Sequence, residues 1–256
     1  MHSINFIGLW TIFAREIHRT RQVLFQAVLS PTLSTVLYFV VFGAAIGTNV
    51  FVVENISYGQ FIVPGLIVMA VITNALSASS SGIYFPRFTG TITDLIVAPL
   101  SYKEIVLGYA LGGTVRALFI GALVYISSLF FIDLTISYPL FALLFITLSA
   151  FVFSLLGIVI GIWAKDFERL ALVPLIIVTP LSFLGGVFYT LEMLPPLWQK
   201  ITLFNPIYYM VDGFRYTLFG SSTTDPFLSL FVLFGMIFTL WFLLAHMFSK
   251  GYGMKA

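Results

Sequence analysis

Residues 184–215 read "LGGVFYTLEMLPPLWQKITLFNPIYYMVDGFR" and interrupt a very apolar chain with three prolines. Two amphipathic pieces follow the first prolines, "LPPLWQKITLF" at 194–204 and "NPIYYMVDGFRYTLFG" at 205–220. Both are shorter than the roughly 20 residues needed to cross about 30 Å of hydrocarbon. Proline near the start of each piece suits the first turn of a helix, where its missing N–H is not needed. The stretch therefore predicts two re-entrant half-helices within residues 191–220.

The alternative for this stretch is an extracellular surface loop, but its many apolar side chains argue against free exposure. Broken backbone at membrane depth also requires protein or a water-lined cavity to satisfy its polar groups. A cation near a helix C-terminus is favoured, so we expect Arg215 to bind carbonyls where the chain turns into the last apolar stretch. Aromatic rings with a polar tip suit the membrane interface, and four are placed there by this interpretation: Trp198, Tyr208, Tyr209 and Tyr216.

The composition places the chain in a membrane. Of its 256 residues, 60% are hydrophobic and 9% are charged, against roughly a quarter charged in a soluble domain. We therefore expect a single transmembrane domain over residues 1–256 with no soluble domain. The net charge is +2 and the only basic block is the short "REIHRTR" at 15–21, so no nucleic-acid partner is expected. The chain has no cysteine, which excludes disulfides.

Six apolar stretches of near-spanning length predict an all-α polytopic membrane protein with six transmembrane helices. They cover residues 23–47, 60–82, 105–132, 139–164, 170–190 and 227–248. Lysine and arginine near the ends of spans mark the cytoplasmic side. In this six-span order one side holds Arg15, Arg19, Arg21, Arg87, Lys103, Lys165, Arg169, Lys250 and Lys255, and the other holds Lys200 and Arg215. Both chain termini are therefore expected in the cytoplasm.

Residues 1–22 predict an amphipathic helix lying in the membrane interface. Phe6 and Trp10 belong to its apolar set, whereas Arg15, Glu16 and Arg19 belong to its polar set. A plain cytosolic extension is the alternative.

The segment 84–104, between the second and third predicted spans, is too long for a tight turn. Its sequence predicts a short helix from Thr91 to Val97, with Asp94 exposed and Leu95, Ile96 and Val97 partly buried. Proline disfavours a helical residue before it, so Pro99 ends this helix at Ala98. The segment is either a docking helix for a partner or an ordinary interfacial loop, and spacing alone leaves both open.

The third span has two further features. Gly108 and Gly112 form one row of small residues, and a second row holds Gly113, Ala117 and Gly121, which predicts close helix packing in lipid. The partner could be the same chain or another copy. Arg116 lies about 18 Å into this span, near the membrane centre, where an ionisable residue is a functional candidate by default. A structural arginine that caps carbonyls is the alternative, since no acidic residue is predicted at the same depth.

Motifs for chemistry are absent from the sequence. There is no G-x-x-x-x-G-K-[ST] phosphate loop, no H-E-x-x-H and no G-x-S-x-G, and the three histidines are scattered. We therefore expect no catalytic residue, no metal site and no bound cofactor on this chain. Any ATP would have to be hydrolysed by another subunit.

At this point the chain resembles the ABC-2 type permease family, the membrane subunits of ABC exporters, and most resembles its YadH-like bacterial members. The resemblance covers nearly the whole chain. It lies in the 184–215 stretch, in "FIVPGLIVMAVITNA" at 61–75 and in "GTITDLIVAPLSYKEIVLGY" at 90–109, where Asp94 replaces the usual glutamate of the family. The gate and signature positions that it marks are Gly185, Gly186, Leu194, Pro195, Asn205, Pro206, Tyr209 and Arg215.

The resemblance implies a permease in the bacterial cytoplasmic (inner) membrane, with two copies forming a homodimer and two separate ABC ATPase subunits holding ATP and Mg²⁺. The helix at 1–22 and the coupling segment 84–104 would contact the ATPase, and the half-helices would form an outer gate. The expected substrate is amphipathic, lipid-linked, polysaccharide or drug-like. The alternative is an ion-driven secondary transporter or channel, which would need paired intramembrane charges. The coupling positions carried over are Arg87, Phe88, Thr91, Asp94, Leu95 and Pro99.

Overall fold

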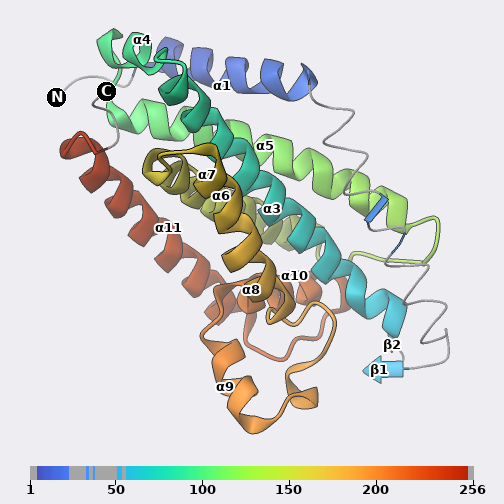
Figure 1. The fold of residues 1–256 in the computed structure, drawn as a ribbon. Helices are drawn as coiled ribbons and strands as arrows, with labels where there is room; N and C mark the ends of the chain where they lie inside the picture. The colour runs from blue at the N-terminus through green and yellow to red at the C-terminus, as the bar shows by residue number, and fades with distance from the viewer. Residues whose placement is uncertain (1–4, 23–32, 35–36, 38–50, 54–55, 253–256) are drawn as a thin grey trace.

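A computed structural model describes residues 5–22, 33–34, 37, 51–53 and 56–252 (Figure 1). Its described part holds four helices long and apolar enough to cross a membrane: α3 (Tyr58–Phe88), α5 (Tyr102–Ser128), α6 (Pro139–Trp163) and α11 (Pro226–Ser249). These confirm the second, third, fourth and sixth predicted spans and the all-α class. The first predicted span, residues 23–47, falls outside the described residues apart from three positions.

The fifth predicted span, 170–190, has no matching long helix. The chain there forms α7 (Phe167–Val173), a π-helical turn η1 (Pro174–Val178) and α8 (Thr179–Phe183). Pro174 cannot donate a hydrogen bond to the preceding turn, and the backbone N–H of Thr179 bonds to the carbonyl of Pro174, five residues back. The helical path then ends at Phe183, well before the predicted boundary at 190. Its 17 residues give a rise of about 25 Å, which is short of the hydrocarbon thickness.

Helix α3 occupies the centre of the bundle, between α5 and α6. Gly157 and Gly161 of α6 lie so close to α3 that an added Cβ would approach the carbonyl oxygens of Leu76 and Ser80 to 2.5 Å. On α5, a Cβ at Gly113 would collide with the Ser79 hydroxyl. Small residues allow this approach where lipid provides no hydrophobic force between helices.

Helix α1 (Phe6–Gln22) packs along the first half of α5 (Figure 1). A Cβ at Gly108 would meet Ile12 at 2.8 Å, and one at Gly112 would meet Glu16 at 2.5 Å. The first row of small residues therefore contacts a helix of the same chain. Glu16 was predicted on the polar face of α1 but is only 4% exposed, because it lies one turn after the buried Ile12 and packs against Gly112 of α5, while Arg15 of the same face is exposed. The location of helix α1 in the membrane interface stays a prediction.

The short helix of the 84–104 segment is α4 (Ile92–Val97), which confirms the predicted element to within one residue. It follows a turn at Gly90, whose φ of 78° favours glycine. Asp94 is exposed and Leu95 is half-buried, as predicted. Val97, however, is 85% exposed, because the helix has one turn and a half and this position faces away from the bundle. The side chain of Ile96 lies outside the described part of the structure.

The end of the bundle opposite α4 holds the half-helices. After the short 3-10 turn η2 (Leu191–Met193), α9 (Pro196–Leu203) and α10 (Pro206–Phe219) each begin at a proline, as predicted. Neither is long enough to cross a bilayer, but their depth in the membrane stays a prediction. A two-stranded antiparallel sheet of β1 (Phe51–Val53) and β2 (Ile56–Ser57), which the sequence did not predict, precedes α3.

Close packing of α3 on α6 gives a test of the fold. We expect Gly157→Ala to lower the midpoint of thermal denaturation in detergent, because the new methyl overlaps a backbone carbonyl and overpacking costs about 1–3 kcal/mol. Gly235→Ala is the matched control, since nothing lies within 4 Å of a Cβ at that position of α11. The control should denature at the wild-type temperature or slightly above it. Equal midpoints for the two variants would contradict this packing.

Candidate functional site

The start of α10 is fastened to the end of α8. Asn205 caps α10 by accepting a hydrogen bond from the Ile207 backbone N–H at 3.0 Å, and its Nδ2 donates to the Leu181 carbonyl at 2.6 Å. That carbonyl belongs to the last turn of α8, where helical carbonyls lack partners within their own helix. Gly185 packs against the start of α10, since a Cβ at this position would meet the Ile207 side chain at 2.9 Å. One asparagine side chain therefore joins two helix ends.

Arg215 is buried on α10 with 7% exposure. Its Nη2 donates to the Gly186 carbonyl at 2.8 Å, and its guanidinium carbon lies 3.9 Å from the centroid of the Phe61 ring. Gly186 has a φ of 72°, and this left-handed turn places its carbonyl toward α10. The expectation that Arg215 binds carbonyls in the α10–α11 link is wrong. The folded 184–186 turn comes closer to this side chain than the link does, and the arginine is a full turn before the end of α10.

Asp212 lies one turn before Arg215 and holds the α10–α11 link instead. Its carboxylate is 1% exposed and accepts hydrogen bonds from the Thr223 N–H at 3.2 Å, the Thr224 N–H at 2.8 Å and the Thr224 hydroxyl at 2.5 Å. Asn205, Asp212 and Arg215 thus tie α10 to three neighbouring segments. We call these three residues the α10 clasp.

A cavity of about 500 Å³ opens beside the clasp. It is bounded by β2, α3, the turn at η2, α10 and the α10–α11 link. Its lining combines aromatic rings, hydroxyls and three ionisable groups: Ile56, Phe61, Thr190, Glu192, Asp212, Arg215, Phe219, Ser221, Ser222 and Thr223.

The remaining gate positions lie toward α9. The Leu194 carbonyl accepts a hydrogen bond from Gln199, Pro195 precedes α9 and is exposed, Pro206 opens α10, and the Tyr209 hydroxyl donates to the Leu203 carbonyl at 2.8 Å. Tyr208, predicted at the membrane interface, is 2% exposed. Its position on α10 faces the bundle rather than the outside.

A second joint lies at the α4 end of the molecule. The Glu104 carboxylate is 4% exposed and accepts the Asn5 N–H at 2.5 Å and the Ser101 N–H at 2.6 Å. The Asn5 side chain also donates to the Pro99 carbonyl at 3.4 Å. One carboxylate therefore connects the start of α1, the end of the coupling segment and the start of α5.

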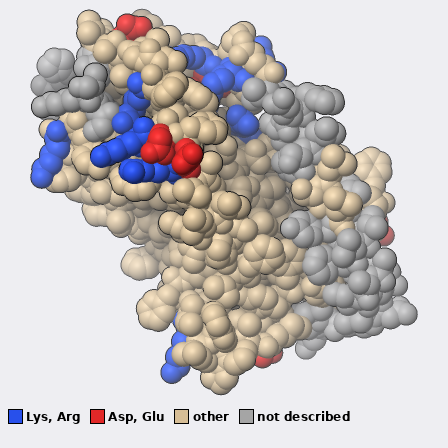
Figure 2. Space-filling model, viewed as in Figure 1, with Lys and Arg blue, Asp and Glu red and all other residues tan. Residues whose placement is uncertain are grey.

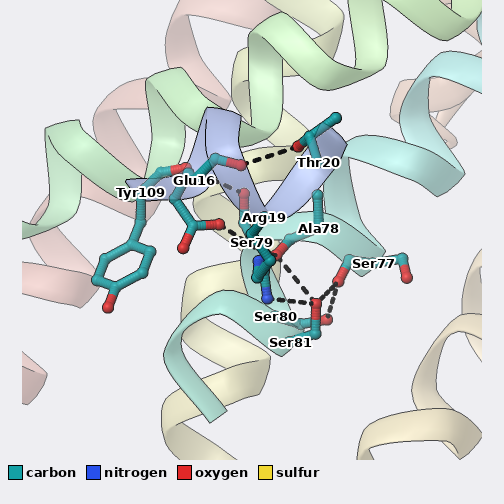
Figure 3. A network of polar contacts seen from close by, with 9 residues as sticks. All are labelled: Glu16, Arg19, Thr20, Ser77, Ala78, Ser79, Ser80, Ser81 and Tyr109. Atoms are coloured by element: carbon teal, nitrogen blue, oxygen red, sulfur yellow. Dashed lines mark hydrogen bonds and ion pairs between the residues drawn. The ribbon is translucent and has the colours of Figure 1, made fainter. Parts of the chain in front are cut away.

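Figure 3 shows a polar network that ties α1 to α3 as well. Arg19 pairs with Glu16 at 2.6 Å and donates to the Ala78 carbonyl at 2.6 Å and to the Ser81 hydroxyl at 3.2 Å. Burial raises the pKa of Glu16 above its ordinary value, and the nearby guanidinium groups of Arg19, Arg15 and, more weakly, Arg116 partly offset this effect. Glu16 is paired with Arg19, and Arg116 forms no ion pair within the described part of the chain, so its role stays a prediction.

The predicted coupling residues divide into two groups. Arg87 is half-buried and donates to the carbonyls of Gly161 and Ala164 at the end of α6, so its guanidinium holds two helices together. Phe88 is 74% exposed, and Thr91, Asp94 and Pro99 are also exposed, while Leu95 packs partly on the core. Figure 2 shows that Lys and Arg side chains gather at this end of the visible face. The clustering expected from the sequence is confirmed here, whereas its cytoplasmic placement stays a prediction.

A family model described as ABC-2 type transporter matches residues 8–219, a range that includes Glu104 and the three residues of the α10 clasp. The chain belongs to the ABC-2 type transporter family. The inner membrane transport permease YadH of Escherichia coli strain K12 is 39% identical over 256 residues, all of both chains. Nodulation protein J of Rhizobium leguminosarum bv. viciae is 25% identical over 240 residues, covering 90% of this chain and 88% of that relative. Nodulation protein J of Rhizobium meliloti is 24% identical over 227 residues, covering 85% and 82%.

Membership in the ABC-2 family and the four apolar helices identify an integral inner-membrane subunit of an ABC transporter. The family implies an ABC ATPase as its partner. Three residues of this ABC-2 subunit were missed by the sequence interpretation: Asp212, Glu104 and Asn5. Glu104 could have been found, because "SYKE" at 101–104 is a capping box, with serine followed three positions later by glutamate. Asp212 could have been found as a second charge one turn from Arg215 in an apolar helix.

The Glu104 joint can be tested by hydrogen exchange. In Glu104→Gln one carboxylate oxygen becomes an amide NH₂, so one of the two backbone donors loses its acceptor at a local cost of about 1–3 kcal/mol. We expect faster exchange in peptides covering 5–12 and 101–107, and unchanged exchange in 205–219. Glu192→Gln, at an exposed position, is the control and should match wild type throughout. If the two variants exchange alike, Glu104 does not hold these segments together.

Proposed function

We propose that the chain is the permease subunit of an ATP-driven exporter that moves an amphipathic, lipid-linked, polysaccharide or drug-like substrate outward across the cytoplasmic membrane. The observation that carries this proposal is the joined corner of α1, α4 and α5. Phe88 at the end of α3 and Val97 of the short helix α4 are exposed there, and the Glu104 carboxylate joins the residue before α1 to the start of α5. Such a corner offers apolar surface to a partner and a rigid connection to the membrane bundle.

The corner supports a direct path for mechanical work. Helix α4 lies between α3 and α5 in the chain, so a partner that pushes α4 must move the ends of both helices. Arg87 connects the same end of α3 to α6. ATP-driven closure of the partner subunits would then favour one of two arrangements of the bundle, as alternating access requires. The α10 clasp, at the opposite end, would serve as the outer gate.

A homodimer with both chain termini in the cytoplasm completes the proposal. Little of α11 is buried within the chain, and Phe231, Phe234 and Phe238 are exposed, so this helix has surface for lipid or for a second copy. The absence of a phosphate-binding loop in the sequence supports ATP and Mg²⁺ being held by the partner ATPase.

Reversing one charge on α4 tests the proposal. We expect Asp94→Arg to abolish export and co-purification of the ATPase, because a wrong charge at a contact costs several kcal/mol, while the purified variant denatures at the wild-type temperature. Asp133→Arg is the control, since Asp133 is also exposed but lies in the link between α5 and α6 at the α9 end. The Asp133→Arg control should retain both export and co-purification of the ATPase.

The readout is substrate export in inverted vesicles, with and without ATP and with and without a protonophore. Export that needs ATP and resists the protonophore supports an ATP-driven permease. Export that ignores ATP and collapses with the protonophore would instead indicate the ion-driven transporter. Normal export by Asp94→Arg would remove α4 as the coupling element.

A further inference from the structure

Two of the charged groups that line the cavity beside the α10 clasp are buried in the folded chain. Asp212 and Arg215 are both more than nine-tenths buried and both line it. The carboxylate oxygens of Asp212 accept hydrogen bonds from the α10–α11 link, as described above. Arg215 is different, because its Nε–H is buried and has no hydrogen-bond partner among the described residues. A buried donor without an acceptor is unfavourable, and a ligand oxygen in the cavity would satisfy it.

The mouth of the cavity offers the complementary acceptor. Glu192 lies in η2, is exposed, and receives no hydrogen bond within the described part of the chain. Thr190, Ser221 and Ser222 add hydroxyls, and Phe219 adds an aromatic wall. The cavity volume of about 500 Å³ lies within the range of small-molecule sites. The lining therefore provides donors and acceptors around a space large enough for a polar headgroup.

The charge balance selects the kind of headgroup. Among the described residues, two carboxylates and one guanidinium face the cavity, so an anionic group such as a phosphate would meet net repulsion. A cationic ammonium would be attracted to the carboxylates but would be repelled by Arg215 and would leave its Nε–H without an acceptor. A hydroxyl or an amide accepts from the guanidinium and donates to a carboxylate at the same time.

We propose that this cavity binds an uncharged headgroup rich in hydroxyl or amide groups, and that it is the outward-facing site for the polar part of the exported amphiphile. The assignment rests on the proposed export function for its physiological role. The headgroup bridges Arg215 and Glu192, and thereby connects α10 to the η2 turn. Arg215 also donates to the Gly186 carbonyl and stacks on the Phe61 ring. A bound headgroup would therefore affect the positions of α3 and of the 184–186 turn through Arg215.

Protection of an introduced cysteine tests the site. The chain has no cysteine of its own, so Ser221→Cys places a single thiol on the cavity wall, and Thr135→Cys places one on the exposed α5–α6 link as a control. The purified chain is held in phosphatidylcholine nanodiscs, whose headgroups carry neither hydroxyl nor amide. Three amphiphiles with the same tail, octyl glucoside, octyl phosphate and octyl trimethylammonium, are added below their micelle concentrations. The rate of thiol alkylation is then measured.

We expect octyl glucoside to slow thiol alkylation in the Ser221→Cys variant and not in the Thr135→Cys variant. The two charged amphiphiles should protect the Ser221→Cys variant about tenfold less well. Arg215→Met should weaken protection by octyl glucoside about tenfold, as expected for one hydrogen bond to a charged group. Glu192→Gln, on the exposed rim, should reduce the discrimination against octyl phosphate without affecting folding. This second variant keeps the test decisive if Arg215→Met does not fold.

Three results would overturn the site: no protection by octyl glucoside, equal protection by all three amphiphiles, or strongest protection by octyl phosphate. Equal protection of the Thr135 control by octyl glucoside would show nonspecific insertion of the tail and would also overturn it. The assay contains neither ATPase nor ATP. Its failure would therefore leave the ATP-driven export proposal standing, and failure of ATP-driven export would leave a positive binding result intact.

Discussion

Contact between helix backbones at the centre of the bundle is the constraint on which the other features depend. Helix α3 lies against α6 where Gly157 and Gly161 leave no room for a side chain, and against α5 at Gly113. In lipid the hydrophobic effect does not drive helices together, so their association depends on the close van der Waals packing that such small residues allow. Once α3 is fixed in the centre, Phe61 at one end reaches Arg215, and Arg87 at the other end reaches the last carbonyls of α6. The two ends of the molecule are thereby built on one rigid helix.

Buried ionisable side chains then act as joints rather than as catalytic groups. Glu104 accepts backbone donors from two segments, Arg19 pairs with Glu16 and reaches α3, and Asp212 holds the α10–α11 link. Removing one partner of a buried charged contact costs more than the contact contributes, because the other partner keeps its desolvation penalty. Such joints therefore specify one arrangement of each segment. They are also places where a second arrangement needs a new partner, such as a bound headgroup or an ATPase surface.

Much of the fold followed from hydrophobic length. Four spans, the short helix at 92–97 and the proline starts of α9 and α10 were predicted from the sequence because apolar runs and prolines are local signals. The end at Phe183 was missed, because hydropathy does not register the turn at 184–186, where Gly186 has a φ of 72°. At the site, the importance of Arg215 came from a family resemblance. Its partners Gly186 and Phe61 are distant in sequence, and no periodicity could have paired them.

The orientation of the bundle tests the account most directly, because an ATPase can reach α4 only from the cytoplasm. Single cysteines at Ser101, next to α4, and at Thr223, beside the α10 clasp, both occupy exposed positions of this cysteine-free chain. An impermeant thiol reagent added to intact spheroplasts should label the cysteine at 223, and should label the one at 101 only after the membrane is opened. Labelling of position 101 in intact spheroplasts with protection of 223 would contradict ATP-driven coupling through α4.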